Sequence, residues 1–522
     1  MKWDAWGDPA AAKELSAGIR SLLDQALGVG EGTTPPLALE DVTVRPSELA
    51  ADDRERFAAI VGDQFCRSDD LGRLLHAGGK STLDLLRRRD PGVQDVPDAV
   101  LLPADEDQIA AVLAHCSTRR IAVVPFGGGT SVVGGLDPIR GEFGAVVSLD
   151  LRRLDALHWL DEESGEAELG AGVTGPEAER LLAERGFSLG HFPQSFCFAT
   201  IGGFAATRSS GQDSAGYGRF DDMVRGLRAV TPAGVLDVGR APASAAGPDL
   251  RQLLVGSEGV FGVITRVRVR VHPVPATTRY EAWSFPDFAT GAAALRAVTQ
   301  TGTGPTVIRL SDEAETGVNL ATTENIGEQQ ITGGCLAVTT FEGSAEHTAS
   351  RHAETRALLE AYGGTSLGEQ PAKAWEHGRF NAPYLRDSLL SAGALCETLE
   401  TATTWSNLPT LKTAVTEALT AALAPALVMC HISHIYPTGA SLYFTVVAAQ
   451  RGNPIEQWRA AKAAACEAIV RTGGTITHHH AVGADHRPWM RAEVGDLGVE
   501  ILRAVKATLD PAGILNPGKL IP

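Results

Sequence analysis

The sequence lacks the features that mark zinc-ribbon, membrane-spanning and nucleic-acid-binding proteins. Its seven cysteines are scattered without a CxxC pair, so we expect buried, reduced thiols in a cytoplasmic protein. No basic tract exceeds Arg87–Arg89, and a net charge of −17 leaves no cationic surface for nucleic acid. The apolar runs are too short to span a bilayer, and the first residues lack the apolar core of a secretory leader.

What is present is enough apolar sequence for several buried cores. The chain has 522 residues, of which 44% are apolar, and its abundant alanine and glycine are typical of a high-GC bacterium. Helices are predicted at Pro9–Leu27, Glu48–Ala59 and Lys80–Arg89. We expect an α+β protein in four stretches: a helical amino-terminal region (1–93), a nucleotide-carrying unit of alternating strands and helices (94–275), a second mixed unit (276–450), and a helical carboxy-terminal segment with a histidine cluster (451–522).

The most informative motif is a run of three glycines after a predicted buried strand, Ile121–Val124. The run is Pro125, Phe126, Gly127, Gly128, Gly129, Thr130 and Ser131. Consecutive glycines can turn through positive φ and leave their N–H groups uncovered, which suits a phosphate or diphosphate. For this motif alone, a plain glycine-rich turn is the alternative.

Two later segments match the first in character. Phe192–Gly211 is rich in small and hydroxyl residues, and Val255–Thr265 carries three glycines just before the alternating run Arg266–Val271. In this order the three segments resemble the FAD-binding domain of the p-cresol methylhydroxylase and vanillyl-alcohol oxidase superfamily. The resemblance implies a fold in which two α+β subdomains bind FAD and a mixed α/β cap domain holds the substrate.

Three single residues in the second unit could carry chemistry. Arg309 lies in an apolar strand and needs an anionic partner or a cavity. Arg386 precedes Asp387 and, read alone, is an arginine paired with its neighbour. Tyr443, in a predicted strand, would by itself be a core residue with a satisfied hydroxyl.

The histidine cluster, His478, His479 and His480, follows a glycine-rich approach. On a strand, His478 and His480 would share a face with His479 opposite, unless the glycines bend the chain. The cluster is either a solvated loop or a cationic or proton-shuttling pocket. No other ligand is obviously spaced to complete a metal site, so we expect no bound metal.

Together these features narrow the resemblance. Arg386, His431–Phe444 and His478–His480 resemble the substrate half of the alkylglycerone-phosphate (alkyl-dihydroxyacetone-phosphate) synthase family, and Cys396–Trp405 and Lys2–Gly7 resemble it too. The resemblance covers about residues 2–515 and implies FAD bound without a covalent link. The residues it implies for cofactor binding are Pro125, Phe126, Gly127, Gly128, Gly129, Thr130, Ser131, Gln194, Ser195, Thr200, Gly202, Gly203, Thr207, Arg208, Ser209, Ser210, Glu258, Gly259, Val260, Phe261, Gly262, Val263 and Ile264.

That family exchanges the acyl group of acyl-dihydroxyacetone phosphate for a long-chain alcohol, without net redox change. The resemblance implies that flavin N5 attacks the substrate and forms an adduct, which loses the carboxylate before the alcohol adds. Tyr443 would be a general acid/base with a lowered pKa, and Arg386, with Arg309, would hold the anionic substrate. His478, His479 and His480 would bind the same anion and relay protons. A lipid-like substrate, a homodimer and peripheral membrane contact complete the expectation.

Two alternatives stay open. The tail Leu509–Lys519 is more like the flavin-dependent 2-hydroxy-acid dehydrogenases. Those enzymes, however, carry Gly-Asp-Gly-Asn where this chain has Thr438–Ser441, and Glu-His-Gly-Ile-Gly where it has His479–Gly483. These departures remove a metal site, so we rank the ether-forming reaction above oxidation of a 2-hydroxy acid or another alcohol. A flavin-binding protein without turnover is the third reading, which intact Tyr443 and Arg386 argue against.

Overall fold

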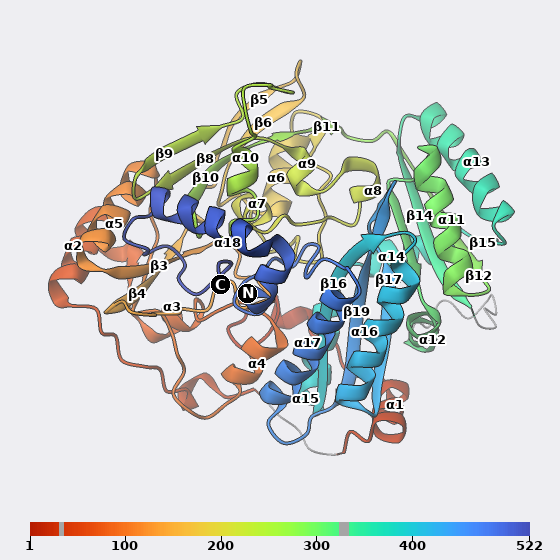
Figure 1. Cartoon of the computed structure of the whole chain (residues 1–522), viewed down its shortest axis with the longest axis horizontal. Coiled ribbons are helices and arrows are strands. Elements are labelled where there is room, and N and C mark those ends of the chain that lie inside the picture. Colours follow the sequence, from red (N-terminus) through yellow and green to blue (C-terminus); the bar gives the residue numbers. More distant parts are fainter. Residues whose placement is uncertain (31–35, 323–333) are drawn as a thin grey trace.

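Three sheets organise the parts of the chain that the computed structural model describes, residues 1–30, 36–322 and 334–522 (Figure 1). The first sheet has the order β1–β2–β4–β3, in which β2, β4 and β3 are parallel and β1 is antiparallel. Its strands are β1 (Cys66–Arg67), β2 (Ala99–Leu101), β3 (Ile121–Phe126) and β4 (Ala145–Asp150). The amphipathic helix α5 (Glu106–Arg119) begins at the side-chain cap Asp105 and buries its apolar face against this sheet.

The second sheet is antiparallel, in the order β5–β6–β10–β8–β9. Its strands are β5 (Leu157–Asp161), β6 (Glu166–Gly170), β8 (Val224–Thr231), β9 (Gly234–Val238) and β10 (Val263–Arg270), and the short pair β7 (Phe187–Ser188) and β11 (His272–Pro273) lies beside it. Helix α7 (Ile201–Thr207) contributes to the core of this sheet, as does the carboxy-terminal helix α18 (Met490–Leu509). The first two sheets are therefore the two subdomains expected of the FAD-binding half.

The third sheet is antiparallel and forms the cap, in the order β15–β12–β14–β13–β17–β19–β16 with β18 beside β19. Its strands are β12 (Thr277–Phe285), β13 (Val307–Ser311), β14 (Cys335–Gly343), β15 (Thr365–Gly368), β16 (Ala394–Thr404), β17 (Ala426–Ile432), β18 (Ile435–Tyr436) and β19 (Gly439–Ala449). Figure 1 shows α16 (Leu408–Leu423) and α17 (Pro454–Arg471) side by side over the β16–β19 end, and α11 (Phe288–Thr301) and α13 (Ala345–Ala361) at the β12–β14 end. The predicted α+β class is confirmed.

The remaining helices are short, and several connect the sheets. They are α1 (Ala17–Leu27), α2 (Ala51–Val61), α3 (Asp70–Leu74), α4 (Thr82–Arg88), α6 (Gly175–Ala183), α8 (Ser214–Tyr217), α9 (Phe220–Met223), α10 (Arg251–Leu254), α12 (Glu313–Thr322), α14 (Gln370–Gly378) and α15 (Ala382–Ser391). Within the described ranges, every helix is too short or too polar to cross a membrane.

The amino-terminal helices differ from their predicted bounds because caps decide where they begin. Instead of one helix from Pro9, α1 starts after Ser16, whose hydroxyl accepts the N–H of Ile19. Helix α4 starts after Ser81, which forms a reciprocal capping box with Asp84. The first 93 residues also supply β1 to the first sheet, so this stretch is not purely helical.

Strand β3, from which the glycine loop emerges, is hydrogen-bonded to the carboxy-terminal tail. Val123 donates its N–H to the Ile514 carbonyl at 2.8 Å, and Asn516 donates its N–H back to the Val123 carbonyl at 2.8 Å. The tail therefore returns to the sheet from which the glycine loop emerges.

Candidate functional site

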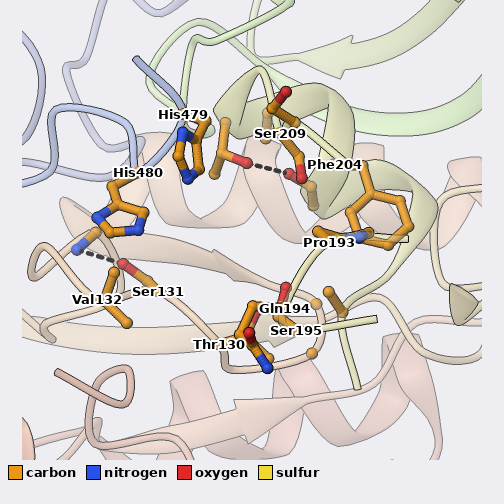
Figure 2. Close-up of a pocket in the computed structure, with 18 of the residues that line it drawn as sticks. Thr130, Ser131, Val132, Pro193, Gln194, Ser195, Phe204, Ser209, His479 and His480 are labelled. Carbon is orange, nitrogen blue, oxygen red and sulfur yellow. Dashed lines mark hydrogen bonds between the residues drawn. The ribbon is translucent and has the colours of Figure 1, made fainter. Parts of the chain in front are cut away.

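A cavity of about 380 Å³ lies where the glycine loop meets the cap sheet. From the first two sheets it is lined by the 125–132 loop, the 193–210 segment and the 258–264 segment. From the cap it is lined by side chains of α15, β13, β16, β17 and β19, and by the histidine loop. Figure 2 shows Thr130, Gln194 and Ser195 on one side of this space and His479 and His480 on another. Segments far apart in sequence therefore share one cavity.

The glycine loop is a close backbone packing site. A Cβ at Gly128 would lie 2.0 Å from the Phe198 carbonyl oxygen, and one at Gly127 would lie 2.4 Å from Thr200 Oγ1. Gly129 has φ of 71°, which a side chain rarely adopts. In the described part of the chain, no hydrogen bond is donated by the backbone N–H groups of residues 127–130. The loop therefore presents free donors to the cavity, as an anion cradle requires.

His76 and Asp150 form a buried pair that packs against the start of the glycine loop. The His76 ring packs against Phe126 with centroids 4.3 Å apart, and His76 Nε2 lies 3.0 Å from Asp150 Oδ2. Asp150 ends β4, so the pair ties the loop to the neighbouring strand. No motif in the sequence pointed to His76, which lies about fifty residues before the glycine loop.

The second predicted segment faces the first. Thr200 caps α7 through Oγ1, which accepts the Gly203 N–H at 3.3 Å, and the buried Gln194 Nε2 has no hydrogen-bond partner among the residues that the structure describes. The predicted cofactor residues of this segment that line the cavity are Gln194, Ser195, Thr200, Gly202, Gly203, Thr207, Ser209 and Ser210. Arg208 does not, because its guanidinium donates to Asp221 at 2.9 Å and to Gln252. Arg208 therefore lies outside the cavity lining, and its contact with the cofactor stays a prediction.

The third predicted segment is only partly at the cavity. Gly259, Gly262 and Ile264 line it, together with Glu258. The side chains of the predicted residues Val260, Phe261 and Val263 instead fill the apolar cores behind it, so any contact of these residues with the cofactor would be through the backbone and stays a prediction.

Glu258 has a structural role that the motif did not predict. Its carboxylate accepts the N–H of Gly483 at 2.8 Å and of Val482 at 3.1 Å, so it joins this segment to the chain just after the histidines. Burial raises the pKa of Glu258 to about 7, which the two backbone donors only partly oppose.

Arg386 projects from α15 to the cavity wall. It is 9% exposed, and it donates to the Lys80 carbonyl at 2.6 Å and to Asp387 Oδ1 through Nε (3.2 Å) and Nη2 (3.0 Å). Although burial opposes the charge, Asp387 raises the pKa of Arg386 above its usual value. A fixed cation therefore lies at the cavity.

Arg309 reaches the cavity but is already paired. Its Nη2 lies 2.5 Å from Glu315 Oε1 and 2.9 Å from His431 Nδ1, and His431 Nδ1 is 3.0 Å from Glu315 Oε2. Burial opposes ionisation of Glu315, but His431 and Arg309 lower its pKa to about 2. Sequence reasoning missed Glu315, six residues after Arg309, and gave no role to His431, which is 122 residues away in the chain.

Tyr443 lies between imidazole rings. Its ring stacks on His431 with centroids 4.8 Å apart and on His479 at 5.9 Å, and the His480 ring lies edge-on at 5.5 Å. Burial raises the pKa of Tyr443 to about 12, against the expectation that nearby charge would lower it. The phenol is therefore protonated at neutral pH, because burial and the nearby Glu397 and Glu400 carboxylates disfavour the phenolate.

The histidine loop forms neither a strand nor a solvated loop. His479 and His480 both line the cavity, whereas His478 turns away and its Nε2 meets the Tyr436 hydroxyl at 2.6 Å. This corrects the expected sharing of a face by His478 and His480. Burial lowers the pKa of His478 to about 3 and also lowers the pKa of His479 and of His480, so a cationic pocket is corrected to a neutral one.

Glu400, on β16, shapes this loop, and sequence reasoning assigned it no role. Its carboxylate accepts the backbone N–H groups of His478 (2.5 Å), His480 (2.8 Å) and His479 (3.2 Å), and the Thr477 hydroxyl at 2.6 Å. Burial opposes its charge, but the three histidines and the Thr477 hydroxyl hold the pKa of Glu400 well below its usual range. An ionised carboxylate with four donors therefore fixes the turn.

One group of side chains could hold a metal ion. Ring nitrogens of His434, His478 and His479 lie within 4.8 Å of one another, and Nδ1 of His434 is oriented by the Ser210 (3.0 Å) and Ser214 (2.7 Å) hydroxyls. His434 is the converging ligand that spacing in the sequence did not reveal.

The residues present fit a flavin dinucleotide. The free amides of the glycine loop suit a diphosphate, and the buried, unpartnered Gln194 Nε2 offers a donor in the same cavity. A Cβ at Gly128 would clash with the Phe198 carbonyl, so the two segments that form the cradle can pack this closely only with glycine at this position.

The comparisons with known proteins agree with this geometry. Residues 97–239 match a family model described as "FAD binding domain", and residues 274–520 match one described as "FAD linked oxidases, C-terminal domain". The chain is 32% identical to the alkyldihydroxyacetonephosphate synthase of Dictyostelium discoideum over 572 residues, covering 100% of this chain and 93% of that protein.

Solved structures point the same way. An alkyldihydroxyacetonephosphate synthase structure superposes with a TM-score of 0.84 at 30% identity, over 99% of this chain and 98% of that one. Substrate-bound p-cresol methylhydroxylase superposes with a TM-score of 0.74 at 16% identity, over 91% of this chain and 98% of that one. The latter is a likeness of fold, as the superfamily resemblance implied.

Proposed function

Because this chain belongs to the alkyldihydroxyacetonephosphate synthase family, we propose that it exchanges the acyl group of an acyl-dihydroxyacetone-phosphate-like substrate for an alcohol. The chain is an FAD-dependent enzyme, which sets aside a flavin-binding protein without turnover. The product would be an ether lipid precursor, and the reaction would have no net redox change.

One observation carries the proposal: Arg386, Tyr443, His479 and His480 converge on the cavity that the glycine loop lines. A cation, a protonated phenol and neutral imidazoles are the groups that a phosphorylated ester and an alcohol require. Helix α15, strand β19 and the histidine loop supply these groups, and the FAD-binding half supplies the opposite wall of the cavity.

The chain's own residues would bind substrate and move protons. Arg386 has five N–H groups and uses three on Asp387 and Lys80, which leaves two for the substrate phosphate. Tyr443, whose pKa of about 12 keeps its proton at pH 7, would donate a hydrogen bond to the departing carboxylate, which leaves as a stable anion. A neutral imidazole of His479 or His480 would accept the proton of the incoming alcohol.

Arg309 has a supporting part in this scheme. Because it is paired with Glu315 and His431, it would act through the His431 ring that stacks on Tyr443 rather than by gripping the substrate alone. Bound FAD would supply a redox-active isoalloxazine ring, whose chemistry no side chain of the protein can replace.

We propose that the FAD is held without a covalent link. The glycine loop, which would contact the diphosphate, offers Phe126 and Thr130 rather than a histidine or cysteine. Precipitation with trichloroacetic acid should therefore leave a yellow supernatant and a colourless pellet. A yellow pellet would contradict non-covalent binding without affecting the proposed reaction.

An anaerobic assay separates the two candidate reactions. Acyl-dihydroxyacetone phosphate and a long-chain alcohol should yield free fatty acid and an ether product, with the flavin oxidised at the end. D-lactate, glycolate and D-2-hydroxyglutarate should leave the visible absorbance of the flavin unchanged. Stoichiometric bleaching by one of these acids, without fatty-acid release from the ester, would instead establish a 2-hydroxy-acid dehydrogenase.

Tyr443→Phe tests the role of the Tyr443 hydroxyl. This variant should keep its FAD and its fold, because the ring still stacks on His431, but should lose turnover by about 10²–10⁴-fold. Thr445→Ser is a matched control, since it is a mild change on the same strand at the same cavity. Normal turnover by the Phe variant would remove the Tyr443 hydroxyl from the mechanism.

A further inference from the structure

The first eight residues form a partly buried segment without helix or strand, which we call the amino-terminal strap. Trp3 and Trp6 are 8% and 6% exposed. The Trp3 carbonyl accepts Arg88 Nη1 at 2.7 Å and Lys80 Nζ at 3.1 Å, and Lys80 Nζ also donates to the Lys2 carbonyl. Two buried cations therefore fix the backbone of the strap.

Asp387 joins the strap to Arg386. Its Oδ2 accepts the backbone N–H of Trp6 at 2.6 Å, while its Oδ1 accepts Arg386 Nε and Nη2. One carboxylate thus divides its two oxygens between a segment 381 residues away and the guanidinium at the cavity. Tyr384, one turn earlier on α15, receives the N–H of Asp8 at 3.2 Å and extends the same contact.

The other side of Arg386 is fixed by the same neighbourhood. The Lys80 carbonyl accepts Arg386 Nη1 at 2.6 Å, and the Lys80 N–H donates to the Ser131 carbonyl at 2.6 Å. Lys80 therefore links the strap, the guanidinium and the glycine loop. With three of its five N–H groups engaged in this way, Arg386 has one orientation left for the donors that face the cavity.

The Trp6 side chain is itself part of the cavity wall. It lines the cavity, and its ring lies edge-on to Phe198 with centroids 5.7 Å apart. The Phe198 carbonyl is the atom that a Cβ at Gly128 would strike. Trp6 consequently fills the space between α15 and the segment that packs on the glycine loop.

We propose that Trp6 and Asp387 are positioning residues, which aim the Arg386 guanidinium at the phosphate of the substrate. This inference rests on the proposed function, because it assumes that Arg386 binds that phosphate. The strap completes the substrate site: its backbone fixes one oxygen of Asp387, and the Trp6 ring prevents α15 from shifting toward the glycine loop.

Binding of dihydroxyacetone phosphate to the FAD-loaded enzyme, followed by calorimetry, tests the inference. Asp387→Ala should weaken binding about tenfold or more, since the hydrogen bonds that orient a charged group are lost. The FAD content and melting temperature should stay close to the wild-type values. Trp6→Phe should also weaken binding, whereas Trp458→Phe, a buried tryptophan in the cap core, should leave it unchanged.

A double-variant cycle shows whether Asp387 acts through Arg386. In an Arg386→Lys background, Asp387→Ala should change the dissociation constant by less than about twofold, because the fork that Asp387 orients is gone. Full additivity of the two effects, or wild-type binding by Asp387→Ala alone, would overturn the inference and leave the proposed function standing. If the wild-type holoenzyme binds no dihydroxyacetone phosphate, the proposed function fails and the inference fails with it.

Discussion

Replacing Glu400 with glutamine should loosen the histidine loop without altering the size of the side chain. The carboxylate uses Oε1 for Thr477, His479 and His480, and Oε2 for His478. Glutamine keeps one acceptor oxygen, so its amide nitrogen would face at least one buried N–H group. Losing a bond to a charged acceptor and leaving its donor unpaired costs about 3 kcal/mol.

Hydrogen–deuterium exchange measures this cost at the three amides involved. A local opening cost lower by about 3 kcal/mol should speed exchange of the 478–480 amides about 100-fold, while amides of β16 should change far less. Turnover should fall, because His479 and His480 lose their fixed place at the cavity.

The matched control is Glu281→Gln. Glu281 is also buried and also has several partners, His352, Arg356 and Ser366, but it lies on β12 away from the cavity. The Glu281→Gln variant should destabilise the cap and leave hydrogen–deuterium exchange of the 478–480 amides unchanged. Unchanged exchange in Glu400→Gln would refute the reasoning, since the carboxylate would then not be what holds the loop.

Two further predictions concern the cofactor loop and pH. Gly128→Ala should purify without FAD, because its Cβ would lie 2.0 Å from the Phe198 carbonyl oxygen. The control variant Gly144→Ala, which has open space around the new Cβ, should purify yellow. Equal flavin content in the two variants would contradict this prediction. Stability should fall as the pH drops from 6.5 toward 3, since burial lowers the pKa of His191 and of His486 to about 3 and the unfolded chain binds the protons first. Within that window each such histidine makes the free energy of unfolding fall by about 1.4 kcal/mol per pH unit. Denaturant titrations at pH 7 and pH 5 measure this fall, and equal free energies of unfolding at the two pH values would contradict the prediction.

Local sequence predicted the cofactor half well because its signals are local. A strand followed by three glycines specifies a turn with free amides, and the turn lies at the end of β3 as expected. The motif does not distinguish residues by the size of their side chains. Val260, Phe261 and Val263 share a small-residue motif with Gly259 and Gly262, but their size places them in the cores behind the cavity.

The cap residues were found by resemblance, and their partners were missed. Glu315 and His431 are 116 residues apart, and nothing in either segment indicates that they meet beside Arg309. The pKa of Tyr443 was also expected to move the wrong way. Counting nearby basic residues suggested a lower value, but burial and the charges of Glu397 and Glu400 outweigh Arg309 and raise the pKa to about 12.

The same device holds three irregular segments at the cavity, which explains why the sequence concealed it. A segment outside helices and sheets has N–H groups without regular partners, and a buried carboxylate can accept two or three of them. Glu400 does this for the histidine loop, Glu258 for residues 482–483 and Asp387 for Trp6, at separations of 78, 224 and 381 residues. Because each carboxylate lies far from its segment in the chain, only the folded structure brings the pairs together, and each pair is a point at which one substitution should move the site while the sheets stay intact.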